Sequence, residues 1–164
     1  MLNQRCPVPK EQQPTNEFIE LSNSIIFSMA KSTKKYIRIL SFLWLITFLI
    51  FIVISTGSVF FAENHIKYFL LSFFSSLITP LLITLRLYLG WNHIFKRLIS
   101  EKVEYEESGW YDGQIWLKQL ELKQKESLIA YIEVKPILKS LIQIGSVIFT
   151  IILSSVLFFQ YSNI

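Results

Sequence analysis

Long apolar runs alternate with short charged segments along this chain. Three stretches are almost free of charge: residues 39–62, 66–91 and 137–161. A membrane-spanning helix needs about 20 predominantly apolar residues, and each stretch is at least that long. The pattern therefore predicts a mainly α integral membrane protein with three transmembrane helices, of which the first two form a tight antiparallel hairpin.

Two residues interrupt the apolar pattern of the second stretch. Pro80 stands near its middle and predicts a kink, because proline cannot donate a backbone hydrogen bond. Arg86 stands in its final turns, and ionisable residues inside a membrane are costly and usually functional. One interpretation is that Arg86 binds a lipid phosphate or another anion. The other is that its long side chain reaches the headgroups from the helix end.

Polar residues recur at helical spacing on the last two stretches. On the second they are Ser72, Ser76, Thr79, Arg86 and His93, and on the third they are Gln143, Ser146, Thr150, Ser154 and Tyr161. Small and hydroxyl residues allow helices to approach closely and to form hydrogen bonds. These two faces either pack against each other or enclose a polar cavity.

The segment before the first apolar run has two parts. Three prolines predict irregular structure over residues 1–16. Residues 17–30 predict an amphipathic helix capped by Thr15 or Asn16, and its apolar positions are Phe18, Leu21, Ile25 and Met29. Because basic residues follow at once, we expect this helix to lie in the membrane interface. The chain thus divides into residues 1–35, 36–91, 92–136 and 137–164.

The loop over residues 92–136 contains the string YEESGWYDGQ, from Tyr105 to Gln114. Asp112 followed by Gly113 is a typical two-residue hairpin turn. A hairpin centred there would place Val103, Tyr105, Trp116, Leu120 and Leu122 on one face, and Glu107 opposite Lys118. We expect this apolar face to dock on the membrane surface, on the N-terminal helix or on a partner, because an isolated hairpin is marginally stable. After a short helix over residues 124–135, Pro136 is expected to break or bend the chain.

Carboxylates and aromatic rings gather at the tip of this predicted hairpin. The candidate interaction residues are Glu106, Glu107, Trp110, Tyr111 and Asp112, together with Arg86. The carboxylates either form a solvated structural hairpin or, with Glu104, provide oxygen ligands for a metal. Against the second interpretation, no histidine stands three or four positions after any of them. We predict no metal and no catalytic residue here.

Charge and composition limit the possible functions. Only 17% of residues are charged and 52% are hydrophobic, which is typical of a membrane protein. The single cysteine excludes an internal disulfide. Lysine and arginine flank the spans on one side, so the positive-inside rule places the N-terminus and the 92–136 loop on the stromal or cytoplasmic side. No nucleotide-binding loop, nucleophile elbow or metalloprotease motif occurs, and we expect no enzymatic activity, no cofactor and no nucleic-acid partner.

Three strings together resemble one family of cyanobacterial and plastid membrane proteins: CPVPKEQQPTNEF, RLYLGW and YEESGWYDGQ. It is the family described as conserved in the green lineage and diatoms, number twenty-seven, or plastid reading frame thirty-six. The resemblance implies a place in a plastid membrane, thylakoid or inner envelope, and an auxiliary role in photosynthesis. It supplies no catalytic residues. Because CPVP stands near the start of the chain, we expect a protein encoded in the plastid rather than imported.

Three functions fit these observations. The first is a non-enzymatic factor for assembly or maintenance of the photosynthetic apparatus, whose partners are membrane lipids and proteins of a photosynthetic complex. The second is a membrane protein that handles a metal or tetrapyrrole and is linked to iron supply. The third is a small transporter subunit that must oligomerise, since three spans are too few for an inverted-repeat transporter.

Overall fold

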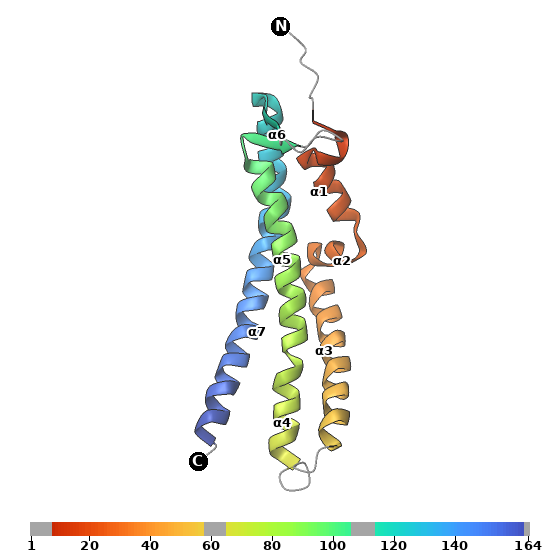
Figure 1. Cartoon of the computed structure of the whole chain (residues 1–164), viewed down its shortest axis with the longest axis vertical. Helices are drawn as coiled ribbons and strands as arrows, with labels where there is room; N and C mark the ends of the chain where they lie inside the picture. The colour runs from red at the N-terminus through yellow and green to blue at the C-terminus, as the bar shows by residue number, and fades with distance from the viewer. Residues whose placement is uncertain (1–7, 58–64, 106–113, 163–164) are drawn as a thin grey trace. The chain divides into compact units, whose positions relative to one another are not determined.

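The computed structural model describes residues 8–57, 65–105 and 114–162. Figure 1 labels the main helices. In chain order the elements are the 3-10 turn η1 (Lys10–Gln12), α1 (Pro14–Asn23), α2 (Ile25–Ser28), the 3-10 turn η2 (Met29–Lys31), α3 (Thr33–Thr56), α4 (His65–Ser76), α5 (Ile78–Ile99), β1 (Lys102–Tyr105), β2 (Gln114–Leu117), α6 (Leu120–Ile129), the π-helical turn η4 (Ala130–Val134) and α7 (Lys135–Ser162).

The elements form two compact units, and each is described by itself. Residues 1–28 and 89–138 form the first, called here the hairpin unit because it contains both strands. Residues 29–88 and 139–164 form the second, called here the helical unit. The helices α5 and α7 each contribute residues to both units.

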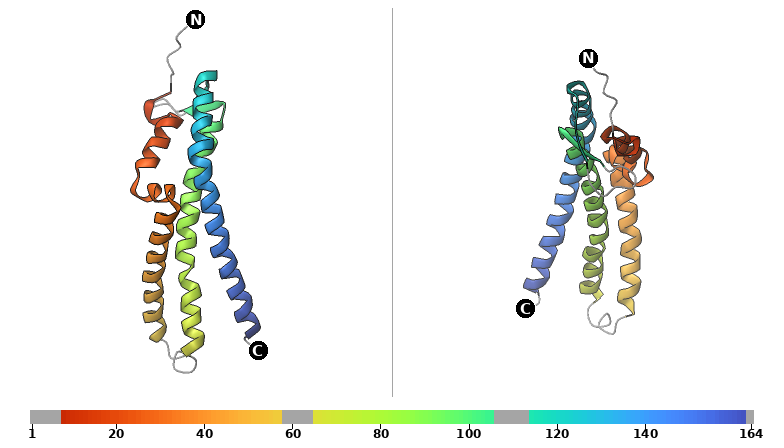
Figure 2. Two further views of the ribbon diagram at one scale, coloured as in Figure 1. Left: turned by 180° about the vertical axis from the view of Figure 1, so that it is seen from behind. Right: turned by 45° about the horizontal axis from the view of Figure 1, so that its top comes forward.

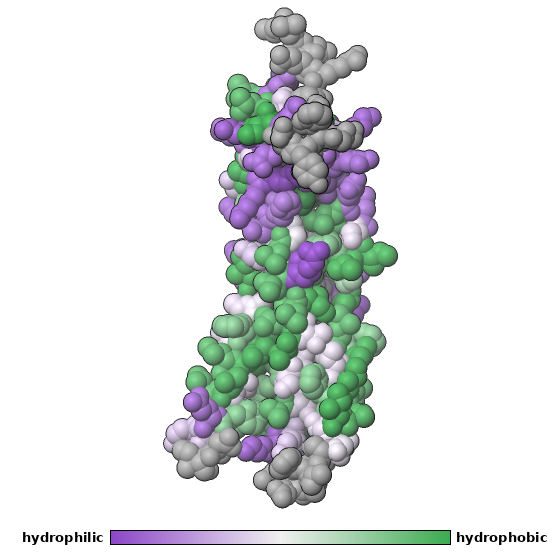
Figure 3. All heavy atoms as spheres, in the orientation of Figure 1, coloured by the Kyte–Doolittle hydropathy of each residue, from purple (hydrophilic) through white to green (hydrophobic). Residues whose placement is uncertain are grey.

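Among the residues that the structure describes, three helical stretches are long and apolar enough to cross a membrane: Thr33–Thr56, His65–Ile99 and Leu120–Tyr161. This is the number predicted from the apolar runs. Large apolar side chains in the helical unit point outward, as Val53 does with 71% of its surface exposed. Figure 3 shows hydrophobic residues over most of the visible surface of these helices. An outward apolar surface of this kind is what a lipid-facing bundle requires.

Aromatic rings and paired hydroxyls hold α3 against α4. Phe73 of α4 is edge-on to Trp44 and to Phe48 of α3, with ring centroids 5.1 and 5.7 Å apart. Farther along the same pair of helices, the hydroxyls of Ser55 and Ser72 are 2.7 Å apart. Figure 2 shows α3 and α4 side by side in both views. These contacts give the two apolar helices a defined packing.

The kink predicted at Pro80 is present as a break at Leu77, between α4 and α5. Proline leaves the carbonyl four residues earlier, that of Ser76, without its helical donor. The Thr47 hydroxyl of α3 lies 3.4 Å from this oxygen, although it is closer to a carbonyl of its own helix. A donor from the neighbouring helix therefore stands beside the carbonyl that proline leaves unpaired, as is common for proline in membrane helices.

A buried hydroxyl pair joins α3 to α5 within the helical unit. The Tyr36 and Thr84 hydroxyl oxygens are 2.6 Å apart, and Thr84 donates to the Pro80 carbonyl at 2.7 Å. Tyr36→Phe is expected to lower the free energy of unfolding by about 1 kcal/mol, because hydrogen bonds between membrane helices contribute about 0.6–1.7 kcal/mol. Thermal unfolding in detergent measures this loss. Adding Thr84→Val should then cost little more, and full additivity of the two losses would contradict the assigned bond.

The polar face predicted on the third stretch is not a packing face. All its members are exposed: Gln143, Ser146, Thr150, Ser154 and Tyr161. The hydroxyls of Ser146, Thr150 and Ser154 each donate to a carbonyl three residues earlier in α7. Instead, Leu141, Ile148 and Ser155 are buried. Hydroxyl side chains can satisfy their hydrogen bonds within one helix, so their spacing alone does not require a facing partner.

The continuous amphipathic helix predicted over residues 17–30 is wrong. The chain leaves the helix at Ser24, whose backbone is extended with a ψ of 136°. The run Ser-Asn-Ser favours this exit, because these side chains compete for backbone hydrogen bonds. Of the predicted apolar face, Phe18 is buried against Trp91, with ring centroids 6.2 Å apart, whereas Ile25 is 83% exposed. Two short helices with different surroundings therefore replace the single one.

The start of α1 also differs from the prediction. Gln13 is the N-cap residue and Pro14 occupies the first helical position, instead of a cap at Thr15 or Asn16. Proline suits this position because its missing N–H would have no partner there. Thr15 is thus released from capping, and its hydroxyl donates to Glu126 of α6 at 2.9 Å.

The two strands pair with a register different from the predicted one. Tyr105 pairs with Gln114 at the end of the ladder next to the connection, whereas a turn at Asp112–Gly113 would have paired Tyr111 with Gln114. The connection is therefore eight residues long, 106–113, and lies outside the described part of the chain. The shift is an even number of residues, so the side chains keep their predicted faces.

Of the break or bend predicted at Pro136, the break is not present. The helix continues from α6 through the π-helical turn η4 into α7. The Lys135 N–H donates to the carbonyl of Ala130, five residues earlier. A π-helical turn is wider than an α-helical one, and it takes up a proline that would otherwise crowd the carbonyl four residues before it.

Candidate functional site

Most of the predicted interaction residues fall between the two strands. Glu106, Glu107, Trp110, Tyr111 and Asp112 all lie in the 106–113 connection, outside the described residues. What the structure describes is the base that carries this connection, from Tyr105 at the end of β1 to Gln114 at the start of β2. The Tyr105 hydroxyl donates to the Gln114 side-chain oxygen at 2.6 Å and joins the two ends directly.

Arg86 belongs to the helical unit, in the part of α5 that follows Pro80. Its side chain is exposed there. An outward arginine in an apolar helix fits both sequence interpretations, an anion ligand or a side chain reaching to the headgroups. The role of Arg86 therefore stays a prediction.

One face of the hairpin packs on the N-terminal segment. Val103 and Tyr105 of β1 form a small buried cluster with Val8, and Trp116 of β2 packs against it. These three strand residues share a face, as the alternation predicted. Val8 lies before the predicted N-terminal helix, so this contact is with the segment that the sequence predicted to be irregular. The predicted face does not extend to Leu120 or Leu122, because both belong to α6.

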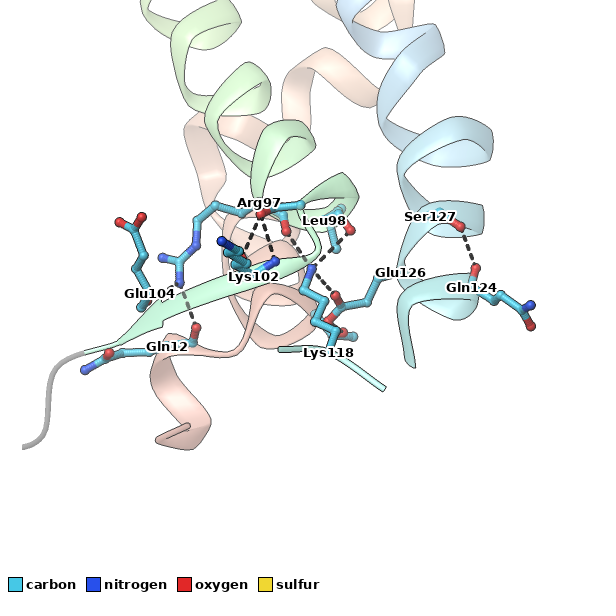
Figure 4. Close-up of polar contacts among 11 residues, drawn as sticks. Gln12, Arg97, Leu98, Lys102, Glu104, Lys118, Gln124, Glu126 and Ser127 are labelled. Carbon is cyan, nitrogen blue, oxygen red and sulfur yellow. Dashed lines mark hydrogen bonds and ion pairs between the residues drawn. The ribbon is translucent and has the colours of Figure 1, made fainter. Parts of the chain in front are cut away.

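A fully buried ion pair lies at the base of β2. The Lys118 ammonium nitrogen is 2.6 Å from Glu126 Oε2, and the two side chains are 0% and 2% exposed. Figure 4 shows Lys118 reaching between the end of α5 and Glu126 on α6. Oε2 faces the ammonium at ion-pair distance without the alignment of a hydrogen bond. The predicted pairing of Lys118 with Glu107 is wrong because the register is shifted. The Lys118 backbone N–H instead donates to the Glu101 carbonyl at 3.0 Å.

The same lysine caps the end of α5. Its ammonium donates to the carbonyl of Arg97 at 2.7 Å and to that of Leu98 at 3.2 Å. The last carbonyls of a helix have no partner within it and carry partial negative charge, so a cation there is favourable. Glu126 is its third contact, made as an ion pair. One side chain thus connects β2, α5 and α6.

A second charged residue, Arg97, ties the N-terminal segment to α5. Its Nη1 is 2.5 Å from Glu17 Oε1 on α1, and its Nη2 donates to the Gln12 carbonyl at 3.0 Å. Nη2 also lies 3.5 Å from the Glu104 carbonyl of β1. Burial raises the pKa of the Glu17 carboxyl above its usual value, and the nearby positive charge of Arg97 opposes this rise. The guanidinium supplies the fork of donors that such a junction needs.

The outer edge of the hairpin carries an exposed ion pair. Lys123 of α6 donates to Glu101 at 2.5 Å, and both side chains are in contact with solvent. The hydrogen bond from Lys123 lowers the pKa of the Glu101 carboxyl below its usual value. An exposed pair of this kind contributes little to stability. It provides a matched control for the buried pair between Lys118 and Glu126.

Metal ligation has no site among the residues that the structure describes. No group of three or more His, Cys, Asp or Glu side chains comes together over residues 8–57, 65–105 and 114–162. Glu104 is exposed on the outer face of β1. The other hairpin carboxylates of the metal hypothesis, Glu106, Glu107 and Asp112, lie outside these ranges.

The chain is thus a small, mainly helical protein in which membrane-length helices accompany an anchored polar hairpin. The family description CGLD27-like, "conserved in the green lineage and diatoms 27", matches residues 6–147, and the chain belongs to this family. This confirms the resemblance drawn from its three sequence motifs. All described contacts of Lys118, Glu126 and Arg97 fall within the matched range.

The similar proteins come from several organisms. The chain is 38% identical over 162 residues to the uncharacterised protein ycf36 of Pyropia yezoensis, with 98% of each chain covered. It is 39% identical to ycf36 of Cyanophora paradoxa, with 90% of this chain and 93% of that one covered. A chloroplastic Arabidopsis thaliana protein, named for the same family, is 36% identical over 83% of this chain and 42% of its own. No solved structure matches the chain.

Proposed function

We propose that this protein is a non-enzymatic auxiliary protein of a plastid membrane that assists assembly or maintenance of the photosynthetic apparatus. Its membrane-length helices insert into the thylakoid or inner envelope membrane, with the N-terminus and the 92–136 loop on the stromal side. The relatives support the plastid location: one carries "chloroplastic" in its name, and others are ycf36 proteins of algae.

The anchored base of the hairpin is the observation that carries this proposal. Lys118 and Glu126 form a buried pair directly after β2, and Val103 and Trp116 pack the strands against Val8. A recognition element that is already fixed loses less conformational entropy when it binds. The buried contacts at the base of the hairpin hold both ends of the 106–113 connection, which suits a segment that binds a partner.

The connection that this base carries has the composition of a contact surface. Trp110 and Tyr111 are aromatic residues of the kind that dominate binding energy in protein interfaces. Glu106, Glu107 and Asp112 supply negative charge, which selects a partner with a basic surface and speeds the encounter. We therefore assign the partner contact to the 106–113 connection, and the partner to a stromal surface of a photosynthetic complex or of an assembly protein.

The double substitution Trp110→Ala and Tyr111→Ala tests this assignment. We expect the variant to leave its complex, because removing central aromatic anchors typically costs about 2 kcal/mol or more each. The measurement is co-migration with photosynthetic complexes on native gels of gently solubilised membranes. The matched control is Gln124→Ala with Lys125→Ala, two exposed residues of α6.

The control should co-migrate as the unmodified chain does, and the test variant should keep normal abundance. Unchanged co-migration of the aromatic variant would contradict the proposed contact. Retention of iron or tetrapyrrole by the purified chain in one-to-one amount would instead favour the metal-handling alternative.

A further inference from the structure

A cavity of about 730 Å³ opens within the hairpin unit. Its lining includes His93, Lys96, Arg97 and Ser100 from α5, and Lys102 and Glu104 from β1. Pockets for small ligands usually enclose about 300–1,000 Å³, so the space exceeds that of a bare inorganic anion. Figure 4 shows Arg97, Lys102 and Glu104 on one side of the end of α5.

The helix supplies its four lining residues at helical spacing. His93, Lys96, Arg97 and Ser100 stand at positions i, i+3, i+4 and i+7, which share one face of a helix. The same turns therefore bring the Lys96 ammonium, the Arg97 guanidinium and the His93 imidazole to one space. Lys102 and Glu104 are alternate residues of β1, and both project from its exposed face.

The part of the cavity lining that the structure describes is positively charged on balance. It contains three permanent cations, Lys96, Arg97 and Lys102, against one carboxylate, Glu104. Arg97 is already paired with Glu17. The two lysines thus outnumber the remaining carboxylate.

The end of a helix is normally unfavourable for an anion, because its last carbonyls carry partial negative charge. Here Lys118 binds the Arg97 and Leu98 carbonyls and offsets that charge. The Glu126 carboxylate balances the charge of the Lys118 ammonium, so Lys118 adds no net positive charge of its own. The net positive charge of the described lining therefore comes from Lys96 and Lys102.

We propose that this cavity binds the phosphate group of a phosphate ester. Lys96 and Lys102 act as mobile point charges on the phosphate oxygens, and the Arg97 side chain supplies a fixed positive charge. Ser100 lines the same space, and its hydroxyl donates to the Lys102 carbonyl at 2.7 Å. The ligand is either an anionic lipid headgroup or a soluble phosphate ester, and both present the same chemistry. In the sequence, Lys96 and Arg97 stand five and six positions after Trp91, the end of the apolar run, where basic residues meet lipid headgroups.

Two titrations of the purified full-length chain in non-ionic detergent distinguish these sources. Native mass spectrometry follows binding of phosphatidylglycerol from mixed micelles, and calorimetry follows binding of inorganic phosphate. The test variant is Lys96→Gln with Lys102→Gln. The matched control is Lys34→Gln with Lys35→Gln, two exposed lysines of α3, which changes the net charge equally.

The cavity variant should bind phosphatidylglycerol about thirtyfold more weakly, because each basic residue near an anionic headgroup contributes about fivefold in affinity. The control should lose no more than about threefold, because only general attraction is reduced. Loss of lipid binding alone assigns the site to a headgroup. Loss of both lipid and phosphate binding assigns it to phosphate esters in general. Equal weakening by both variants, or by neither, would overturn the proposal, while circular dichroism confirms that both variants are folded.

Discussion

Glu126→Gln is expected to lower the free energy of local unfolding of the hairpin unit by about 3–5 kcal/mol, which is the usual loss when one member of a buried ion pair is removed. The Lys118 ammonium would stay 0% exposed with no carboxylate to balance it. Thr15 would also lose an ionised acceptor for its hydroxyl, which lies 2.9 Å from Glu126 Oε1. The loss approaches the whole stability of a small domain, so the strands should open readily.

Hydrogen exchange of the β1 and β2 amides in detergent measures this effect residue by residue. Glu101→Gln is the matched control, because it removes the same charge from the exposed pair with Lys123 and should leave exchange unchanged. Lys118→Met combined with Glu126→Leu should recover more than half of the loss, since an apolar pair leaves no buried charge. Recovery should stay incomplete because the Arg97 and Leu98 carbonyls lose their donor. A single Glu126→Gln variant as protected as the control would contradict the assigned burial.

Gly90→Ala is expected to destabilise the packing of α2 on α5 by about 1–3 kcal/mol, the usual range for an overpacked contact. A Cβ added at Gly90 would lie 2.3 Å from the Phe27 Cε1 atom. Alanine favours a helix over glycine by about 1 kcal/mol, so helix propensity alone predicts the opposite sign. The clash should exceed this gain because the Phe27 ring is half-buried and has to leave its position.

Gly145→Ala in α7 is a matched control for that substitution. Its added Cβ would lie 3.4 Å from the Thr84 Cγ2 atom, which is an ordinary contact. We expect Gly145→Ala to be neutral or to stabilise by up to about 1 kcal/mol, measured by thermal unfolding in detergent. Phe27→Ala should remove the clash, so that adding Gly90→Ala to it becomes favourable. Destabilisation by Gly90→Ala that persists without the Phe27 ring would show that the close contact is not its cause.

The helices of this protein could be predicted because their signal is long and local. Each of the three apolar runs is about 20 residues or more, and periodic patterns of that length are dominated by one structure. The ends were less predictable. The helix α5 continues to Ile99, well past the apolar run that ends at Trp91. Lysine and arginine favour a helix about as strongly as leucine does, so the helix need not end where the apolar run ends.

The hairpin shows where local turn chemistry misleads. Asp112–Gly113 has the residues of a two-residue turn, yet the strands pair as though centred three residues earlier. The observed register places Val103 and Trp116 together against Val8, a residue about a hundred positions away. Packing of that kind outweighs turn preference, and nothing within the hairpin itself indicates it. Val103, Tyr105 and Trp116 still share the predicted face because the register shifted by an even number of residues.

Two ion pairs of the hairpin unit, Lys118 with Glu126 and Arg97 with Glu17, could not be predicted from the sequence. Lys118 and Glu126 stand eight positions apart across the boundary between β2 and α6, where neither strand nor helix spacing relates them. Arg97 and Glu17 are eighty positions apart. Such pairs are visible only once the elements are packed, because each residue alone is typical of a solvated surface. A co-varying pair in an alignment is the signal that could have revealed them.

The most direct test of the proposed function is affinity isolation of a tagged chain from gently solubilised photosynthetic membranes. Mass spectrometry identifies the proteins that co-purify, and metal and pigment are measured in the same sample. We expect subunits of a photosystem or of its assembly machinery, without stoichiometric metal. A chain isolated without protein partners and with one equivalent of iron or tetrapyrrole would contradict the proposed function.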